Sequence, residues 1–363
     1  MVTPTTRRLL FKVLPYPIIF MLAGLLYVNV EYGLLEDATH YPESMTLYNP
    51  INSLISILIM NCLLGLVLGI LEELIFKNRF KQRSFTIKIL AKTLLYIFIF
   101  LTTVMVFSFL LNAANSGGSI TSKEVYLPTI EFFMSFGLVS IVVFAGFIIA
   151  LSLFFSEIVD YLGLDIVGNF FSGKYSKPVI ENRIFMFLDM KDSTTIAEKI
   201  GHQKQYRLLN DYYREMTAAI VQTEGAIYQY VGDEIIVSWS REQGLEQSNC
   251  LQCFFLIEKS IAARSQHFLD HYGVVPGFKA GLHLGEVTRG QVGQIKRDLL
   301  YTGDVLNATA RIQGLCNKVG ERLLISSELK KVLPAHPFQF VSKGEFELRG
   351  RQQKAEIFTV SEA

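Results

Sequence analysis

Long apolar runs fill the first part of the chain and are absent from the rest. Before about residue 160, uncharged hydrophobic stretches recur, whereas later residues mix apolar and charged positions at helix and strand intervals. A helix needs about 20 apolar residues to cross a bilayer. The pattern therefore predicts an α-helical membrane domain over residues 1–155, a four-helix transmembrane bundle with spans at about 14–30, 51–70, 89–111 and 132–155.

Basic residues around these spans predict their orientation. Loops rich in Lys and Arg stay on the cytoplasmic side of a membrane. Such residues precede the first span and join the second span to the third, whereas the other two loops carry only Lys123. We therefore expect a multi-pass protein of the cell (inner or plasma) membrane, with both termini in the cytoplasm and the lipid bilayer as a partner.

Four charged residues of the apolar half lie near the ends of the predicted spans. They are Glu72, Glu73, Lys92 and Glu131. Long charged side chains at a span end can extend to the membrane surface. We therefore interpret these four as interfacial charges.

Composition narrows the choice of partners. The formal net charge is +1, and the soluble half has no extended basic tract or aromatic-basic interleaving. We therefore expect no nucleic-acid partner. The cysteines are too few and too unevenly spaced for a disulfide framework, so we expect reduced thiols.

Residues 156–180 connect the membrane domain to a predicted cytoplasmic domain at 181–363. Apolar residues recur at helix-like intervals from Ser156 to Asn169, and Gly173 and Pro178 then interrupt the pattern. This predicts a connecting helix followed by a linker. A helix that transmits a signal and an inert spacer both agree with the sequence.

Two carboxylates stand at the tips of predicted elements in the soluble domain. The apolar run Ile184 to Leu188 ends in Asp189, and the β-rich stretch AIYQYVGDEIIVSW turns at Asp233, which predicts a hairpin. Mg²⁺ prefers one or two carboxylates together with substrate phosphates. The pair predicts a metal site, although a turn or capping role would explain either residue alone.

The segment after Asp189 predicts a phosphate-binding helix start. Ser193 and Thr194 open a helical pattern whose first backbone N–H groups are free to bind phosphate oxygens. Farther along, Asn307 and Arg311 are four residues apart, so they share one face of a predicted helix. The helix start therefore suits phosphate oxygens, and the side chains of Asn307 and Arg311 can point at one ligand.

Four motifs in register resemble the catalytic domain of class III adenylate and guanylate cyclases over about residues 180–360. They are FLDMKDST, YVGDE, FKAGLHLGEV and YTGDVLNATARI. The resemblance implies an α+β ferredoxin-like fold with a central antiparallel sheet. It also implies a head-to-tail homodimer with active sites between the protomers, and two Mg²⁺ (or Mn²⁺) ions per site.

The same resemblance implies a role for each matched residue. Asp189 and Asp233 would bind the metal ions, Asn307 would orient the ribose, and Arg311 would stabilise charge at the α-phosphate. Two further residues, Lys279 and Arg351, match basic positions that contact the polyphosphate.

Base selection is where the sequence departs from the family pattern. Gln229 and Leu300 occupy the two base-reading positions, where adenine- and guanine-specific members carry other residues. We expect ATP as the substrate and an adenylate cyclase (a phosphorus-oxygen lyase) as the enzyme, on family frequency. The alternatives are a guanylate cyclase and a catalytically silent, cyclase-like nucleotide receptor.

Overall fold

The chain forms two compact units, Thr6–Gly168 and Asn169–Ala363, with Met1–Thr5 grouped with the second. The computed structural model describes residues 3–35, 49–80, 83–117, 119, 121–163, 167–168, 173, 177–295, 298–334, 337–347 and 354–362.

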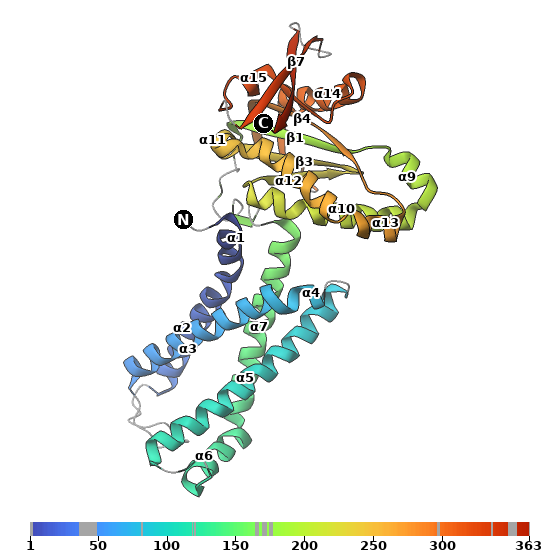
Figure 1. Cartoon of the computed structure of the whole chain (residues 1–363). Coiled ribbons are helices and arrows are strands. Elements are labelled where there is room, and N and C mark those ends of the chain that lie inside the picture. Colours follow the sequence, from blue (N-terminus) through green and yellow to red (C-terminus); the bar gives the residue numbers. More distant parts are fainter. Residues whose placement is uncertain are drawn as a thin grey trace. The chain divides into compact units, whose positions relative to one another are not determined.

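The first unit is entirely helical in its described residues (Figure 1). Its elements are α1 (Pro4–Val13), α2 (Pro15–Leu35), α3 (Pro50–Leu71), the π-helix η1 (Glu72–Phe76), α4 (Lys77–Arg79), α5 (Phe85–Ser116), α6 (Lys123–Met134) and α7 (Phe136–Leu162). Four stretches of these helices are long and apolar enough to cross a membrane, namely Thr6–Leu35, Pro50–Phe76, Phe85–Leu110 and Phe136–Leu162.

The fourth apolar helix begins later than the sequence pattern indicates. The predicted span starts at residue 132, but α6 ends at Met134 and a new helix starts at Phe136. Ser135 lies between them in an extended conformation, and its hydroxyl accepts a hydrogen bond from the backbone N–H of Leu138 at 3.2 Å. This cap starts α7, which then continues without a break to Leu162.

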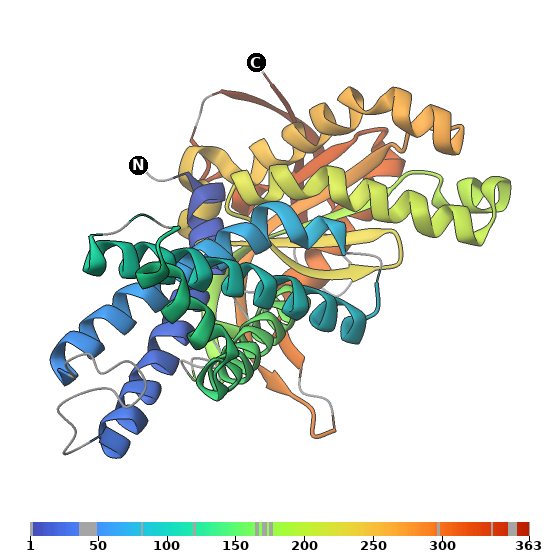
Figure 2. The same cartoon turned by 90° about the horizontal axis from the view of Figure 1, so that it is seen from below.

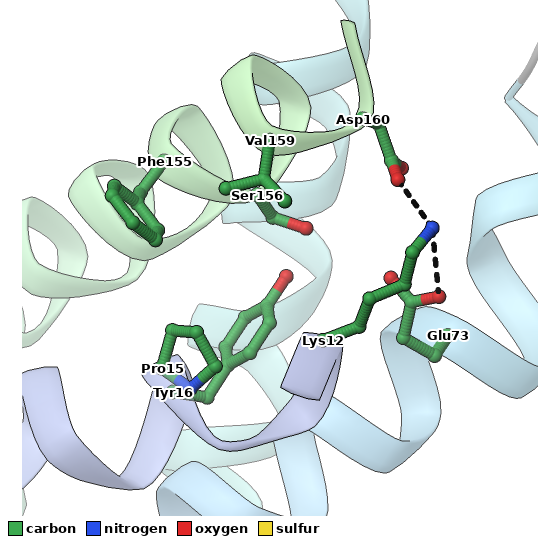
Figure 3. A pocket seen from close by; sticks show the side chains of 8 residues that line it. All are labelled: Lys12, Pro15, Tyr16, Glu73, Phe155, Ser156, Val159 and Asp160. Carbon is green, nitrogen blue, oxygen red and sulfur yellow. Dashed lines mark hydrogen bonds and ion pairs between the residues drawn. The ribbon is translucent and has the colours of Figure 1, made fainter. Parts of the chain in front are cut away.

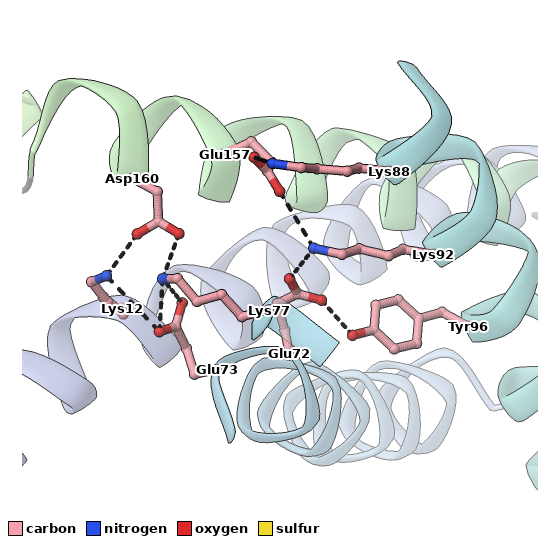
Figure 4. Close-up of polar contacts among 9 residues, drawn as sticks. All are labelled: Lys12, Glu72, Glu73, Lys77, Lys88, Lys92, Tyr96, Glu157 and Asp160. Atoms are coloured by element: carbon pink, nitrogen blue, oxygen red, sulfur yellow. Dashed lines mark hydrogen bonds and ion pairs between the residues drawn. The ribbon is translucent and has the colours of Figure 1, made fainter. Parts of the chain in front are cut away.

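Two of the charges interpreted as interfacial are buried instead. Glu72 and Lys92 have exposed fractions of 3% and 1%. Lys92 forms an ion pair with Glu72 and another with Glu157 at 3.3 Å, and the Tyr96 hydroxyl donates to Glu72 at 2.6 Å (Figure 4). Lys88 also pairs with Glu157, at 3.3 Å. The interfacial interpretation is therefore wrong for Glu72 and Lys92.

A second group of ion pairs continues this network. Lys12 lies 2.6 Å from Asp160 and 3.9 Å from Glu73 (Figures 3 and 4). Lys77 pairs with Asp160 and, at 3.0 Å, with Glu73. We call the eight residues together the lysine–carboxylate cluster: Lys12, Glu72, Glu73, Lys77, Lys88, Lys92, Glu157 and Asp160. Each charge in the cluster has at least one opposite partner, which offsets the cost of burial.

The second unit is built on one sheet with helices on both faces (Figure 1). Its strands are β1 (Val179–Met190), β2 (Ala226–Val231), β3 (Glu234–Ser240), β4 (Phe278–Val292), β5 (Asp298–Thr302), β6 (Leu323–Ser326), β7 (Phe338–Phe346) and β8 (Ala355–Glu362). Its helices are α9 (Ser193–Ile200), α10 (His202–Gln222), α11 (Arg241–Leu245), η2 (Glu246–Ser248), α12 (Asn249–Ala263), α13 (Ser265–Tyr272), α14 (Asp304–Val319) and α15 (Ser327–Lys330).

The sheet is mixed rather than wholly antiparallel. Its order is β2-β3-β1-β4-β6-β8-β7, and β5 pairs with β4 in a long hairpin that extends from the rest of the sheet (Figure 2). β6 runs parallel to β4 because the chain returns through α14 between them. The predicted combination of four apolar helices with an α+β cyclase-type domain is confirmed, with this correction to the sheet.

Strand β1 shows how the sheet separates two cores. Ile184, Met186 and Leu188 point to the larger core, which includes Tyr212 of α10 and Phe254 of α12. The alternate residues Phe185 and Phe187 join a smaller core with Tyr301 and Val305 at the start of α14. Side chains alternate along a strand, so Asp189 shares the face of Phe185 and Phe187. β1 therefore presents Asp189 on the α14 side of the sheet.

Candidate functional site

The sheet brings the two predicted metal-binding aspartates together. Asp189 lies opposite Glu234 in the β1–β3 pairing, and Asp233 is the turn residue directly before that strand. Gly232 in the same turn has φ +64°, a conformation that favours glycine. The Tyr213 hydroxyl of α10 donates to the Gly232 carbonyl at 2.9 Å, which fixes the turn beside the end of β1.

Lys279 approaches Asp189 from the opposite side. It faces Asp189 in the β1–β4 pairing, and its Nζ lies 3.2 Å from Oδ2 of Asp189. The same oxygen accepts a hydrogen bond from Nε2 of Gln313 at 3.1 Å. Gln313 reaches it because Gly281 lets α14 lie directly on β4: a Cβ on Gly281 would be 2.7 Å from Cα of Gln313.

The electrostatics of this group show an excess of negative charge. Burial raises the pKa of Asp189 above its usual range, and the hydrogen bond and charge of Asp233 raise it further, while Lys279 opposes the shift. Burial, then the charges of Asp189 and Asp233, raises the pKa of Glu234 to about 7. Three carboxylates therefore surround one lysine, an arrangement that favours a bound cation.

The aspartate pair fits a divalent ion in the company of a phosphate. Among the residues that the structure describes, no group of three His, Cys, Asp or Glu side chains is arranged to hold a metal ion. Mg²⁺ binds through one or two carboxylates and takes its remaining ligands from water and substrate phosphates. Asp189 and Asp233 supply those two carboxylates, so a nucleotide would complete the coordination.

Asn307 and Arg311 lie on a different side of α14 from Gln313. Arg311 and Gln313 are two residues apart, which separates them by roughly 200° around the helix. Gln313 is buried against Asp189, whereas Asn307 is exposed and Arg311 is half-buried. The chain thus does not direct Arg311 at its own Asp189.

Arg311 nevertheless has the character of an anion-binding group. Its Nη1 is buried and has no hydrogen-bond partner within the described part of the chain. An arginine is always charged, and a buried donor without an acceptor is costly. A negatively charged ligand would satisfy that N–H.

The remaining predicted residues are more dispersed. Ser193 begins α9 half-buried and Thr194 is exposed beside it. Gln229 is exposed on β2, and Leu300 is half-buried on β5. In the sheet, β2 and β5 are separated by β3, β1 and β4. Arg351 lies outside the described residues.

Sequence reasoning missed three residues that shape this site. Glu234 directly follows Asp233, so its position in the hairpin was a usable signal. Gln313 of α14 donates to Asp189, and Tyr213 of α10 donates to the backbone carbonyl of Gly232, so both reach the site from helices packed on the sheet. Sequence spacing alone carries no signal for those two contacts.

Comparisons with known proteins identify the family of the second unit. Residues 176–362 match the family model "Adenylate and Guanylate cyclase catalytic domain". The chain is 31% identical over 210 residues to adenylate cyclase 2 of Rhizobium meliloti (strain 1021), a match that covers 58% of each protein. It is 25% identical over 185 residues to adenylate cyclase 1 of the same organism, covering 48% of this chain and 27% of that one. The chain thus spans less than two thirds of each of these relatives.

Among solved structures, the chain is similar to the adenylyl cyclase CyaB from P. aeruginosa. The identity is 20%, the match covers 52% of this chain and 97% of that chain, and the TM-score is 0.46. The family model alone covers just over half of the 363 residues. The matched part contains the motifs and the paired aspartates described above. The chain therefore belongs to the class III adenylate and guanylate cyclases.

Proposed function

We propose that this protein is a membrane-anchored adenylate cyclase that converts ATP to 3′,5′-cyclic AMP and pyrophosphate as a homodimer. The observation that carries the proposal is the group of three carboxylates with one lysine at the end of β1. Such an uncompensated group has no stabilising role for the fold, but it suits a metal-bound polyphosphate. The catalytic domain is residues 181–363, with 156–180 as its linker.

The chemistry is an in-line displacement at the α-phosphorus. The ribose 3′-oxygen forms a bond to the α-phosphorus and loses its proton. The bond from the α-phosphorus to the oxygen that bridges to the β-phosphate breaks, and pyrophosphate leaves with that oxygen. When bound to Asp189 and Asp233, two Mg²⁺ or Mn²⁺ ions would make the 3′-hydroxyl more acidic and neutralise the polyphosphate. Lys279 adds a positive charge beside them, and Gln313 holds Asp189 in position.

Two further groups act on the reacting nucleotide. Arg311 would donate to the α-phosphate as charge develops there, which is differential stabilisation of the transition state. Asn307 would orient the ribose from the same face of α14. Ser193, Thr194 and Arg351 are proposed to contact phosphates.

The two directions in which these groups point support the proposed homodimer. Asp189 and Arg311 of one chain face different sides, so a complete site needs Arg311 from a second chain. Apolar side chains at two hairpins support an interface. Val231 in β2 is 49% exposed, and Val292 in β4 is 53% exposed. Such side chains gain by burial against a partner.

ATP is proposed on the strength of the relatives rather than of the base-reading residues. The two relatives described above are named adenylate cyclases. Gln229 carries an amide that can both donate to and accept from a purine edge, whereas Leu300 offers only packing. Conversion of GTP to cyclic GMP and binding without turnover are the alternative outcomes.

The apolar helices are proposed to cross the plasma membrane with both termini in the cytoplasm. This orientation brings the catalytic domain to the compartment that holds nucleoside triphosphates. The distribution of basic residues supports this orientation, because the two loops assigned to the outside contain one Lys, Lys123, and no Arg.

The deciding experiment measures cyclic nucleotide formation by purified full-length protein with ATP, GTP, CTP and UTP in turn, each with Mg²⁺ and with Mn²⁺. Cyclic AMP from ATP alone would establish the proposed activity. Cyclic GMP would transfer the proposal to GTP, and nucleotide binding without any product would favour a receptor.

Complementation tests the shared site. Asp189→Asn and Arg311→Ala variants are each expected to be inactive as homodimers. In an equal co-expression with random association, about half of the dimers would be mixed, and each mixed dimer would have one intact site of two. The expected activity is therefore about one quarter of that of the wild type. Activity no higher than that of the separate variants would contradict a site built from two chains.

A further inference from the structure

A large cavity lies among the helices of the first unit, and none of the proposed nucleotide-binding residues lines it. Its volume is about 660 Å³, and side chains from α2, α3, α5, α6 and α7 line it. Cavities of about 300–1,000 Å³ accommodate small organic ligands. The lysine–carboxylate cluster contributes none of its residues to this lining.

Most of the wall is apolar and aromatic. Phe20 of α2, Phe100 of α5 and Phe144 of α7 line it, together with small Ala145. Tyr27 and Phe144 lie with ring centroids 6.0 Å apart. This composition favours a hydrocarbon body in the cavity.

One part of the lining is polar and carries a carboxylate. Glu31 from the end of α2 lies beside Asn49, Asn52 and Ser53 at the start of α3. The Ser53 hydroxyl donates to Oε2 of Glu31 at 2.5 Å. Glu31 is half-buried within one of the candidate membrane spans, where an ionised carboxylate requires compensation.

The neighbouring sequence offers that carboxylate no lysine or arginine. Neither Lys nor Arg occurs between Lys12 and Lys77, a range that contains both helices bearing Glu31 and its polar neighbours. Within the described residues, Ser53 is the hydrogen-bond partner of Glu31 and no lysine or arginine pairs with it. This differs from Glu72, Glu73, Glu157 and Asp160, each of which has a lysine.

We infer that the cavity binds a cationic amphiphile, with its ammonium group at Glu31 and its hydrocarbon part against the aromatic wall. A cation at this position would pair with Glu31, and Tyr27 and Phe144 offer aromatic faces that also favour cations. The ammonium could belong to a free amine or to the headgroup of a bilayer lipid. The inference does not depend on cyclase activity.

The test measures equilibrium binding of radiolabelled dodecylamine to full-length protein in nanodiscs, with empty nanodiscs subtracted. Dodecanol and dodecanoic acid, with the same chain length, serve as neutral and anionic competitors. We expect unlabelled dodecylamine to compete at least about tenfold better than dodecanol, and dodecanoic acid to compete least. Equal competition by all three would overturn the inference.

Two variants with matched controls localise the binding. Glu31→Gln should remove the preference for the amine, whereas Glu131→Gln, an exposed carboxylate on α6, should keep it. Ala145→Phe should fill the cavity and weaken all three probes. Val143→Phe, on the outer face of the same helix with 68% exposure, should not. An unchanged preference for the amine in Glu31→Gln would refute the site. This result does not depend on whether Ala145→Phe folds.

The bilayer composition distinguishes the two sources of the ammonium group. Nanodiscs made with phosphatidylethanolamine should reduce dodecylamine binding severalfold if a lipid headgroup occupies the site. Equal binding in nanodiscs with and without that lipid, with the amine preference intact, would identify a free amphiphile as the ligand. Loss of the preference for the amine in Glu31→Gln supports the inference in either case.

Discussion

The helical unit and the catalytic domain each gather acidic and basic side chains, but in different proportions. In the helical unit, Lys12, Lys77, Lys88 and Lys92 face Glu72, Glu73, Glu157 and Asp160, so charges balance one to one (Figure 4). At the end of β1, the carboxyl groups of Asp189, Asp233 and Glu234 lie with one lysine of the described residues, Lys279. In the first group every charge has a partner within one chain, whereas the second group is the one proposed to bind a metal ion.

We interpret this difference as one between a structural group of charges and the proposed functional site. A balanced group stabilises a fold only while every partner is present, because each removal leaves an uncompensated buried charge. An unbalanced group weakens the free protein and gains its partners when ligand binds. Substitutions in the two groups should therefore affect different measurements.

The largest effect is expected at the unbalanced group. Asp233→Ala removes one of two carboxylates proposed to hold the metal ions, so turnover should fall by at least about a thousandfold. Its folding should not suffer, because the substitution also lowers the repulsion on Asp189 and Glu234. Cyclic nucleotide formation and the unfolding of Trp239, the single and buried tryptophan, measure these two properties separately. Full turnover in the variant would contradict the site.

The two groups also differ in how far the sequence predicts them. Asp189 lies at the end of a strand and Asp233 in a hairpin turn, so local pattern alone places both at the tips of their elements. Glu72 and Lys92 are twenty positions apart on different helices, and their pairing depends on how the helices pack. A sequence pattern shows that both lie near span ends, but it contains no information on which helix faces meet.

The same reasoning explains the other differences from the sequence-based picture. The four apolar helices follow from run length alone, but the break at Ser135 depends on one cap in an otherwise apolar stretch. Motif spacing identifies Asn307 and Arg311 as a pair on one helix face. The contact of Gln313 with Asp189 depends on the close approach of α14 at Gly281.

The next largest effect is expected in the balanced group. Lys92→Met leaves Glu72 buried with only the Tyr96 hydroxyl as a donor, which should destabilise the helical unit by about 3–5 kcal/mol. Loss of helical ellipticity during an SDS titration measures this change. Trp239 fluorescence should follow the wild-type curve, since it lies in the other unit.

Two further variants sharpen that result. Lys92→Met combined with Glu72→Gln removes both charges and should recover most of the lost stability. Lys88→Met removes a lysine of the same cluster with 19% side-chain exposure, and it should cost no more than about 1 kcal/mol. Equal losses in Lys88→Met and Lys92→Met would show that burial does not decide the energetics of this cluster.

Arg311 is a cation whose removal should lower turnover, as removal of the aspartates should. Arg311→Ala should lower kcat by about a hundredfold or more with a smaller change in KM, because its proposed contact strengthens in the transition state. The unfolding midpoint should not fall, since the side chain has a buried N–H without a partner in the described chain. A proportional rise in KM at constant kcat would instead assign Arg311 to ground-state binding.

The smallest expected effect concerns Glu234 and depends on pH. Its pKa of about 7 is raised from 4.5, so the folded domain loses stability as the pH rises from about 4.5 through 7. At pH 8, Glu234→Gln should therefore be more stable than the wild type by on the order of 1–2 kcal/mol, a figure reduced for solvent screening of a half-buried group. At pH 4.5 the two proteins should be nearly equal in stability. Unfolding followed by Trp239 fluorescence at both pH values measures the difference. A gain of the same size at both would mean that the substitution acts through packing and not through the excess charge at the end of β1.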